Sequence, residues 1–146
     1  MKKIRLLWVG RTKDRALAER IEYYTKLLSG YARVSIVEIK EERGRDAAAS
    51  REAEGNRILA ASGSFLLLDE RGREYTSPGF AKFLEASDVT DIVIGGAFGV
   101  SDAVRAKARE SIALSRMTFT HEMARMILLE QLFRAMTILK GKDYHH

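Results

Sequence analysis

Three glycines follow an apolar run in the middle of the chain, at Gly95, Gly96 and Gly99 within "DIVIGGAFGVSD". Glycine lets a ligand approach the main chain where a Cβ would intrude, so this stretch predicts a pocket lined by backbone. The spacing is neither the dinucleotide fingerprint G-x-G-x-x-G nor a Walker loop, because no Gly-Lys-Ser/Thr follows. Two alternatives stay open on these residues alone: a tight turn into the next helix, or a phosphate held at that helix's N-terminus.

Polar residues of the C-terminal third are the other candidates for chemistry. His121 stands at the expected N-terminus of the last helix, where the helix dipole disfavours imidazolium, although a lone histidine there is also typical of a cap. Glu130 and Arg134 have the i,i+4 spacing of an ion pair. Tyr144 and His145 near the end are either chemical groups or part of a frayed terminus carrying the remnant of a tag.

The elements that must position these residues alternate along the chain. The predicted strands are Ile4–Val9, Val34–Ile39, Phe65–Leu68, Ile92–Ile94 and Met117–Phe119, and the predicted helices are 14–28, 46–61, 77–86, 101–110 and 121–140. This alternation predicts a single α/β domain, residues 1–146, around a mostly parallel sheet. The third and fourth runs are apolar without alternation, as in central strands covered on both faces. Since ligands bind beyond the carboxyl ends of parallel strands, we expect the site in the loops after Leu68 and Ile94.

Composition narrows the class of protein. The chain has 146 residues, of which 46% are hydrophobic and 31% charged, and no cysteine, which excludes disulfides, thiolate metal sites and a cysteine nucleophile. Its three histidines lack a familiar ligand spacing, so we expect no metal. No apolar run suits a membrane span or a secretory signal, so we expect a cytoplasmic protein. The net charge is +5, and seven Lys or Arg fall in the first 20 residues, which form either a phosphate-facing patch or a solvated face.

The last predicted helix, 121–140, is apolar around most of its circumference, wider than one stripe packed on a sheet requires. Either the helix lies deep in the domain or it buries a second face against another subunit. We expect a homodimer with twofold symmetry, the commonest arrangement of soluble oligomers.

Four segments in this order resemble the RlmH family of small SPOUT-class methyltransferases: "LLLDERGREYTS", "IVIGGAFGVSD", "LSRMTFTHEMARMILLEQLFRAMTILKG" and a terminal "YH". The similarity runs from "WVGRTKD" to the last residues. It implies an α/β knot, with a C-terminal trefoil and a mostly parallel sheet of five to six strands, an exception to the rule against knots. It also implies a homodimer that completes the active site. Two positions depart from the family, which commonly has proline where this chain has Thr120 and Asp143.

The resemblance implies a cofactor, a substrate and site residues. The cofactor is S-adenosyl-L-methionine, and the substrate is N3 of a pseudouridine in helix 69 of 23S ribosomal RNA within the assembled 70S ribosome. The residues that match the family's cofactor contacts are Leu68, Gly95, Gly96, Leu114, Ser115, Arg116, Met117, Thr118 and Phe119. Arg134, Tyr144 and His145 are the candidate catalytic residues, placed where they stabilise the anion formed when N3 loses its proton. Phe98 or Tyr144 supplies a stacking face for the unstacked base.

Two other functions remain as alternatives. One is a ribosome- or RNA-binding module of the same fold that has lost the cofactor and does no chemistry. The other is a protein that binds a nucleotide phosphate at the N-terminus of helix 101–110. Only the methyltransferase would both bind the methyl donor and methylate ribosomes.

Overall fold

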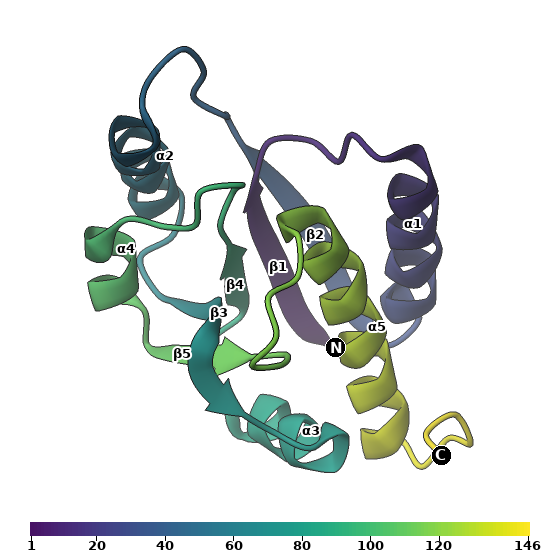
Figure 1. The fold of residues 1–146 in the computed structure, drawn as a ribbon. Coiled ribbons are helices and arrows are strands. Elements are labelled where there is room, and N and C mark those ends of the chain that lie inside the picture. The colour runs from purple at the N-terminus through teal and green to yellow at the C-terminus, as the bar shows by residue number, and fades with distance from the viewer.

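The structure is a computed structural model that describes residues 1–146, and it forms one sheet with helices on both faces (Figure 1). In chain order the elements are β1 (Lys2–Val9), α1 (Arg15–Ser29), β2 (Ala32–Ile39), α2 (Ala47–Ala61), β3 (Phe65–Glu74), α3 (Ser77–Ala86), β4 (Asp91–Ile94), α4 (Asp102–Lys107), β5 (Glu110–Ala113) and α5 (His121–Leu139). The predicted alternation of five strands with five helices is therefore confirmed.

The five strands are ordered β2-β1-β4-β3-β5, and every neighbouring pair is parallel. The central strand β4 is buried along its whole length, with β3 beside it, as the two continuous apolar runs predicted. Ile94 of β4 lies between Trp8 of β1 and Leu68 of β3. Because all strands point the same way, the loops after β1, β3 and β4 meet at one edge of the sheet, its carboxyl edge.

Side chains alternate along the strands between two cores. Leu6 and Trp8 of β1 face the larger cluster of 20 buried residues, to which α1, α3 and α5 contribute. Leu7 and Val9 face a smaller cluster of 8 residues that includes Ile58 of α2 and Val104 of α4. The molecule is thus a three-layer sandwich, visible in Figure 1, with most of its apolar burial on the side of α5.

The wide apolar circumference of α5 has mainly an internal cause. The helix packs between α1 and α3 and on the sheet, and Leu128, Leu129 and Leu132 are completely buried. The first of the two alternatives, a helix deep in the domain, therefore explains most of the pattern. Apolar surface remains exposed near its N-terminus, where Met123 is 36% exposed and Met117 in the preceding loop 75%.

All five helices begin at a residue whose side chain accepts a hydrogen bond from the backbone N–H three residues later. These N-caps are Asp14, Asp46, Thr76, Ser101 and Thr120. Thr120 is one of the two departures from the resembled family. Its hydroxyl accepts from the N–H of Met123, so the position that lacks the proline ring gains a capping bond at the start of α5.

The predicted fifth strand, Met117–Phe119, is wrong. The strand is Glu110–Ala113, and the predicted helix 101–110 ends earlier, at Lys107. Ile112 and Ala113 are buried against β3, whereas Met117 and Phe119 lie exposed in the following loop. The strand Glu110–Ala113 has only two apolar residues, next to each other, so it gives almost no alternation of apolar and polar residues. The segment Met117–Phe119, "MTF", does alternate and therefore predicts a strand.

The segment after Leu68, predicted as a loop, instead continues β3 to Glu74. Its pairing with β5 shifts register between Leu68 and Arg73. At Gly72 the two strands come so close that a Cβ would lie 2.5 Å from the carbonyl carbon of Ser111. Only glycine permits this approach, which brings the end of β3 alongside the loop after β5.

Candidate cofactor cavity and C-terminal cluster

A cavity of about 870 Å³ opens at the carboxyl edge of the sheet, between the segments that follow Leu68, Ile94 and Ala113. Its volume lies within the range of small-molecule sites. Eight of the nine predicted cofactor residues line it, namely Leu68, Gly95, Gly96, Leu114, Ser115, Met117, Thr118 and Phe119. The fold thus gathers residues from three separate segments of the chain, as the carboxyl-end rule predicts.

Arg116, the ninth predicted cofactor residue, does not line the cavity. Its guanidinium Nη1 donates to the carbonyl of Glu70 at 2.8 Å, and its Nε lies 2.8 Å from the carboxylate of Glu74. The neighbouring Thr118 hydroxyl donates to the Glu70 carboxylate. Arg116 therefore holds the loop after β5 against the extension of β3, and in this way it positions one wall of the cavity.

The glycines of the loop after β4 serve two purposes. Neither Gly95 nor Gly96 has a positive φ, but space is tight at both. A Cβ on Gly95 would lie 2.8 Å from the Val100 side chain, and one on Gly96 would lie 3.3 Å from Val9. Gly99 has φ +80° and donates its N–H to the Gly96 carbonyl at 3.0 Å, closing a turn. The sequence left open whether these glycines form a tight turn or a backbone-lined wall. In the structure the loop does both.

Asp69 and Arg105 also line the cavity, and sequence reasoning did not single out either residue. The Arg105 Nε donates to the Asp69 carboxylate at 2.9 Å. Burial opposes ionisation of Asp69, but hydrogen bonds from the Arg71 N–H and from Arg105 outweigh it and keep the pKa of Asp69 below its ordinary value. Asp69 directly follows the apolar run of β3, so its position alone could have marked it as a candidate site residue. Its pairing with a residue of α4 was not readable.

His121 lies at the mouth of the cavity, at the first position of α5. Burial, together with the positive charge of Arg125 one turn later, lowers the pKa of His121. The imidazole is therefore neutral at pH 7, as its place at a helix N-terminus indicated. His121 is neutral and Arg105 is paired with Asp69, so neither adds an unpaired positive charge to the cavity.

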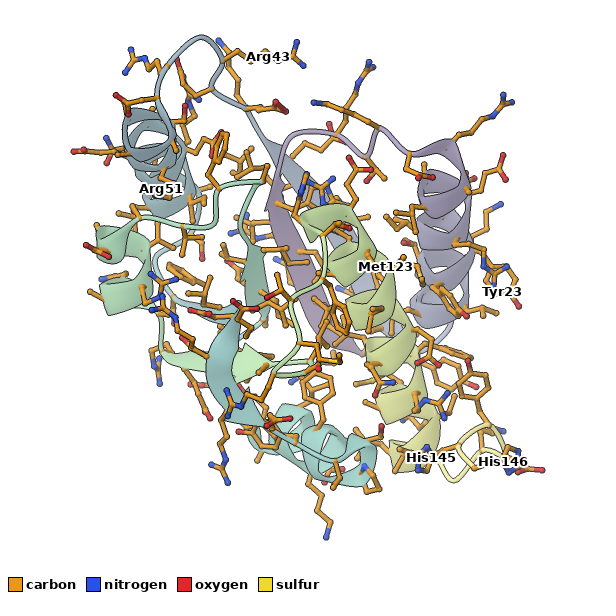
Figure 2. The ribbon with its side chains drawn as sticks, viewed as in Figure 1. Tyr23, Arg43, Arg51, Met123, His145 and His146 are labelled. Atoms are coloured by element: carbon orange, nitrogen blue, oxygen red, sulfur yellow. The ribbon has the colours of Figure 1, made fainter.

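The predicted catalytic residues gather at the other end of α5, where the C-terminal tail folds back. The Arg134 Nη1 lies 3.0 Å from Nδ1 of His145, and the Tyr144 ring packs on Phe133 with centroids 4.7 Å apart. Glu130, which joins them, accepts from Arg134 at 2.8 Å, so the predicted i,i+4 pair is confirmed. The tail is docked on the helix and is not frayed (Figure 2).

This C-terminal cluster does not reach the cavity within one chain. Arg134 follows His121 by 13 positions, about 20 Å along an α-helix. In Figure 2, Met123 lies toward one end of α5 and His145 lies at the other. One copy of the chain therefore keeps the predicted cofactor residues and the predicted catalytic residues apart.

No three His, Cys, Asp or Glu side chains are placed where they could hold a metal ion. None of the five helices combines the length and the hydropathy that a bilayer crossing requires.

A parallel sheet with a glycine-walled cavity at its carboxyl edge is the architecture of α/β proteins that bind small organic cofactors. Within that class, the chain belongs to the SPOUT methyltransferase family, whose model, described as "Predicted SPOUT methyltransferase", matches residues 1–145. The resemblance stated from the sequence motifs is therefore confirmed.

Curated relatives and a solved structure agree with this family. The relative from Geobacter sp. (strain M21), named ribosomal RNA large subunit methyltransferase H, is 45% identical over 152 residues covering 99% of each chain. The relative of the same name from Thermodesulfovibrio yellowstonii is 40% identical over 146 residues, the whole of both chains. "A probable methylase family protein" from Haemophilus influenzae Rd KW20 is similar in fold alone, with a TM-score of 0.57, 11% identity, and coverage of 96% of this chain and 67% of that one.

Proposed function

We propose that this protein transfers a methyl group from S-adenosyl-L-methionine to N3 of a pseudouridine in helix 69 of 23S ribosomal RNA, in the assembled ribosome of the cytoplasm. The relatives' name, ribosomal RNA large subunit methyltransferase H, supports the class of substrate. The observation that carries the proposal is the cavity, because eight of the nine residues that match the family's cofactor contacts line it. The trefoil knot belongs to this proposal and stays a prediction.

The residues of the cavity fit this cofactor. The sulfonium of S-adenosyl-L-methionine supplies an already activated methyl group, so the protein's task is placement. The bare backbone at Gly95 and Gly96 and the loop 114–119 give close contact to an uncharged adenosine. Asp69 stays ionised but is paired with Arg105, and His121 stays neutral, so neither the pair nor the imidazole adds an unpaired positive charge that would repel a sulfonium.

The C-terminal cluster supplies the groups that act on the base. When N3 loses its proton, negative charge spreads onto the neighbouring carbonyl oxygens, where Arg134 offers a cation and Tyr144 a hydroxyl. Tyr144 donates its one hydroxyl proton to Glu130, and burial together with this hydrogen bond raises the pKa of Tyr144 to about 12, so the hydroxyl keeps its proton until the base competes for it. His145, in contact with Arg134, completes the set.

A second copy of the chain brings these groups to the cavity. Support comes from the distance of about 20 Å along α5 that separates Arg134 from His121. Further support comes from exposed apolar side chains, Met117 and Phe119 in the cavity wall and Met123 next to it, a surface suited to a partner subunit. In a twofold dimer each cavity would receive the tail of the other protomer.

The test is complementation between two inactive variants. Gly95→Ala damages the cavity wall and Arg134→Ala the C-terminal cluster; the two are co-expressed with different tags, and the mixed dimer is purified. Mass spectrometry of large-subunit RNA after incubation with ribosomes and the methyl donor should show about half the wild-type rate, because one of two composite sites is intact. An inactive mixed dimer would reject the composite site. No methylation by wild-type protein would reject the function itself.

A further inference from the structure

The positive charge of the first 20 residues does not form one patch in the structure. Lys2 lies at the amino end of β1 and donates to the Ser87 carbonyl at 3.0 Å. Arg5 is paired with Asp91 at 2.6 Å. The phosphate-facing surface expected from this segment therefore has to be sought elsewhere, among cations that have no acidic partner.

Two such cations follow neighbouring strands at the carboxyl edge. Arg11 comes after β1 and Lys40 after β2; both are exposed, and neither forms an ion pair. The strands end together, since Val9 pairs with Ile39 and the Gly10 N–H donates to the Ile39 carbonyl at 2.7 Å. Adjacent strands lie about 4.8 Å apart, so the two cations emerge close to each other. The nearby cations Lys13 and Arg43, by contrast, both contact the carboxylate of Glu41.

The loop after β4, the next strand of the sheet, adds an aromatic ring. Helix α2, beside this loop, adds a third unpaired cation. Phe98 in the loop after β4 is 58% exposed. Arg51 of α2 donates to the Phe98 carbonyl at 3.4 Å and has no acidic partner; Figure 2 shows Arg51 beside this loop. Gly96, Ala97 and Gly99 of the same loop line the cavity. An exposed aromatic face thus stands directly next to the predicted methyl-donor site.

The loop that carries Arg11 is held in place by the first turn of α5. The Glu122 carboxylate accepts the N–H groups of Lys13 and Asp14 at 3.0 and 2.9 Å. Arg125, which is completely buried, donates to the Val9 carbonyl at 2.6 Å and to the Thr12 hydroxyl at 3.0 Å. The same helix turn places His121 at the cavity, so Arg11 has a fixed place relative to the cofactor site. A loop ordered in advance loses less entropy on binding.

We infer that Arg11, Lys40, Arg51 and Phe98 form the docking surface for the substrate RNA, here called the carboxyl-edge surface. The three cations contact phosphates of a single-stranded loop, and the Phe98 ring stacks on an unpaired base beside the cavity. This inference rests on the proposed function and adds to it the residues that receive the RNA.

A matched pair of double variants tests the electrostatic part. Arg11→Ala with Lys40→Ala removes the two cations that follow β1 and β2. Lys3→Ala with Arg33→Ala removes two exposed, unpaired cations that face each other at the amino ends of the same strands. We expect the first pair to raise the KM for ribosomes about tenfold and to lower the salt-dependence slope of RNA binding by about 1.4, since each single-strand phosphate contact contributes about 0.7. The second pair should change neither quantity, and calorimetry should show unchanged S-adenosyl-L-methionine affinity for both.

Phe98 is tested by size and aromaticity. Phe98→Ala should weaken binding of RNA about tenfold, whereas Phe98→Trp should retain it, because stacking needs an aromatic face of any kind. If the two double variants had equal effects, or if Phe98→Ala kept full activity, the proposed docking surface would be rejected. The proposed methyl transfer would not be affected by either result. If wild-type protein does not methylate ribosomes, the proposed function fails separately. The docking surface is then tested by the binding of fluorescein-labelled oligouridine. If the double variant at Arg11 and Lys40 binds this RNA as tightly as the wild-type protein, the docking surface is rejected.

Discussion

The Tyr144 hydroxyl donates a hydrogen bond of 2.8 Å to the Glu130 carboxylate, and this contact fastens the C-terminal tail to α5. The same carboxylate oxygen accepts from Arg134 at 2.8 Å. We expect Glu130→Gln to loosen both groups and to lower kcat by tenfold to about a hundredfold, the order of loss caused by misplaced catalytic groups. S-adenosyl-L-methionine affinity, measured by calorimetry, should not change. An unchanged kcat would mean that Glu130 only supports the fold.

Removal of the tail should separate methyl transfer from cofactor binding. A chain ending at Lys142 lacks Tyr144 and His145 but keeps every residue that lines the cavity. We expect it to bind S-adenosyl-L-methionine normally and to lose methylation of purified ribosomes. The control is a chain ending at His145, which should remain active. Wild-type rates in the shorter chain would assign the tail a dispensable role.

Acidification should weaken cofactor binding through His121, whose pKa is lowered by burial and by Arg125. The imidazole stays neutral down to about pH 6.5, its ordinary pKa, and becomes charged only below that. Added positive charge beside a sulfonium is unfavourable, so affinity should be level from about pH 8 to 6.5 and then fall. Calorimetry from about pH 8 to well below 6.5 should show a flatter profile for His121→Gln. The same fall in the variant would point to a different group.

The Arg5–Asp91 pair should contribute to stability in a pH-dependent way. Burial opposes ionisation of Asp91, yet hydrogen bonds from Arg5 and Ser62 outweigh it and hold the pKa of Asp91 below its ordinary value. Its contribution is therefore full above about pH 4, the unfolded-state pKa, and is lost as pH falls through the folded-state pKa. Asp91→Asn should lower the free energy of unfolding by about 1–3 kcal/mol at pH 7. In urea titrations that difference should shrink near pH 3. The exposed Asp88→Asn is the control.

A charge at Met123 should disrupt the proposed dimer. Met123 is an exposed apolar side chain next to the cavity, and Met117 is an exposed one in the cavity wall. Burying an unpaired glutamate at an interface costs more than about 1.4 kcal/mol, so Met123→Glu should raise the dimer dissociation constant by about tenfold or more. Sedimentation should show monomers that remain folded but no longer methylate, whereas Met123→Leu should stay dimeric. A dimeric Met123→Glu protein would move the interface elsewhere.

Periodicity predicted the helices and the buried strands because their signals are local. The Asp and Thr caps mark helix starts within three residues, and the continuous apolar runs at β3 and β4 identify the centre of the sheet. The fifth strand was missed because its position depends on pairing with β3 around Gly72, which no local pattern records.

The candidate site divides in the same way. The motifs found the glycines and the loop 114–119, but Asp69 with Arg105 comes together only through packing of α4 on β3. The distance between the cavity and the C-terminal cluster follows from the predicted helix 121–140, but the folding of the tail back onto α5 could not be read from the sequence. The candidate residues between Leu114 and His145 are thus divided between the cavity and the C-terminal cluster.

The bonds from Glu122 and Arg125 to the loop 10–14 join residues 108 to 113 positions apart in the chain. The first loop of the protein can therefore reach its final conformation only after the last helix has been made and has docked. A growing chain that has completed the strands but not α5 lacks His121, and it has no partner for the N–H groups of Lys13 and Asp14. Closing so long a loop is slow compared with local helix formation. We expect the amide hydrogens of Lys13 and Asp14 to be among the last to gain protection during refolding.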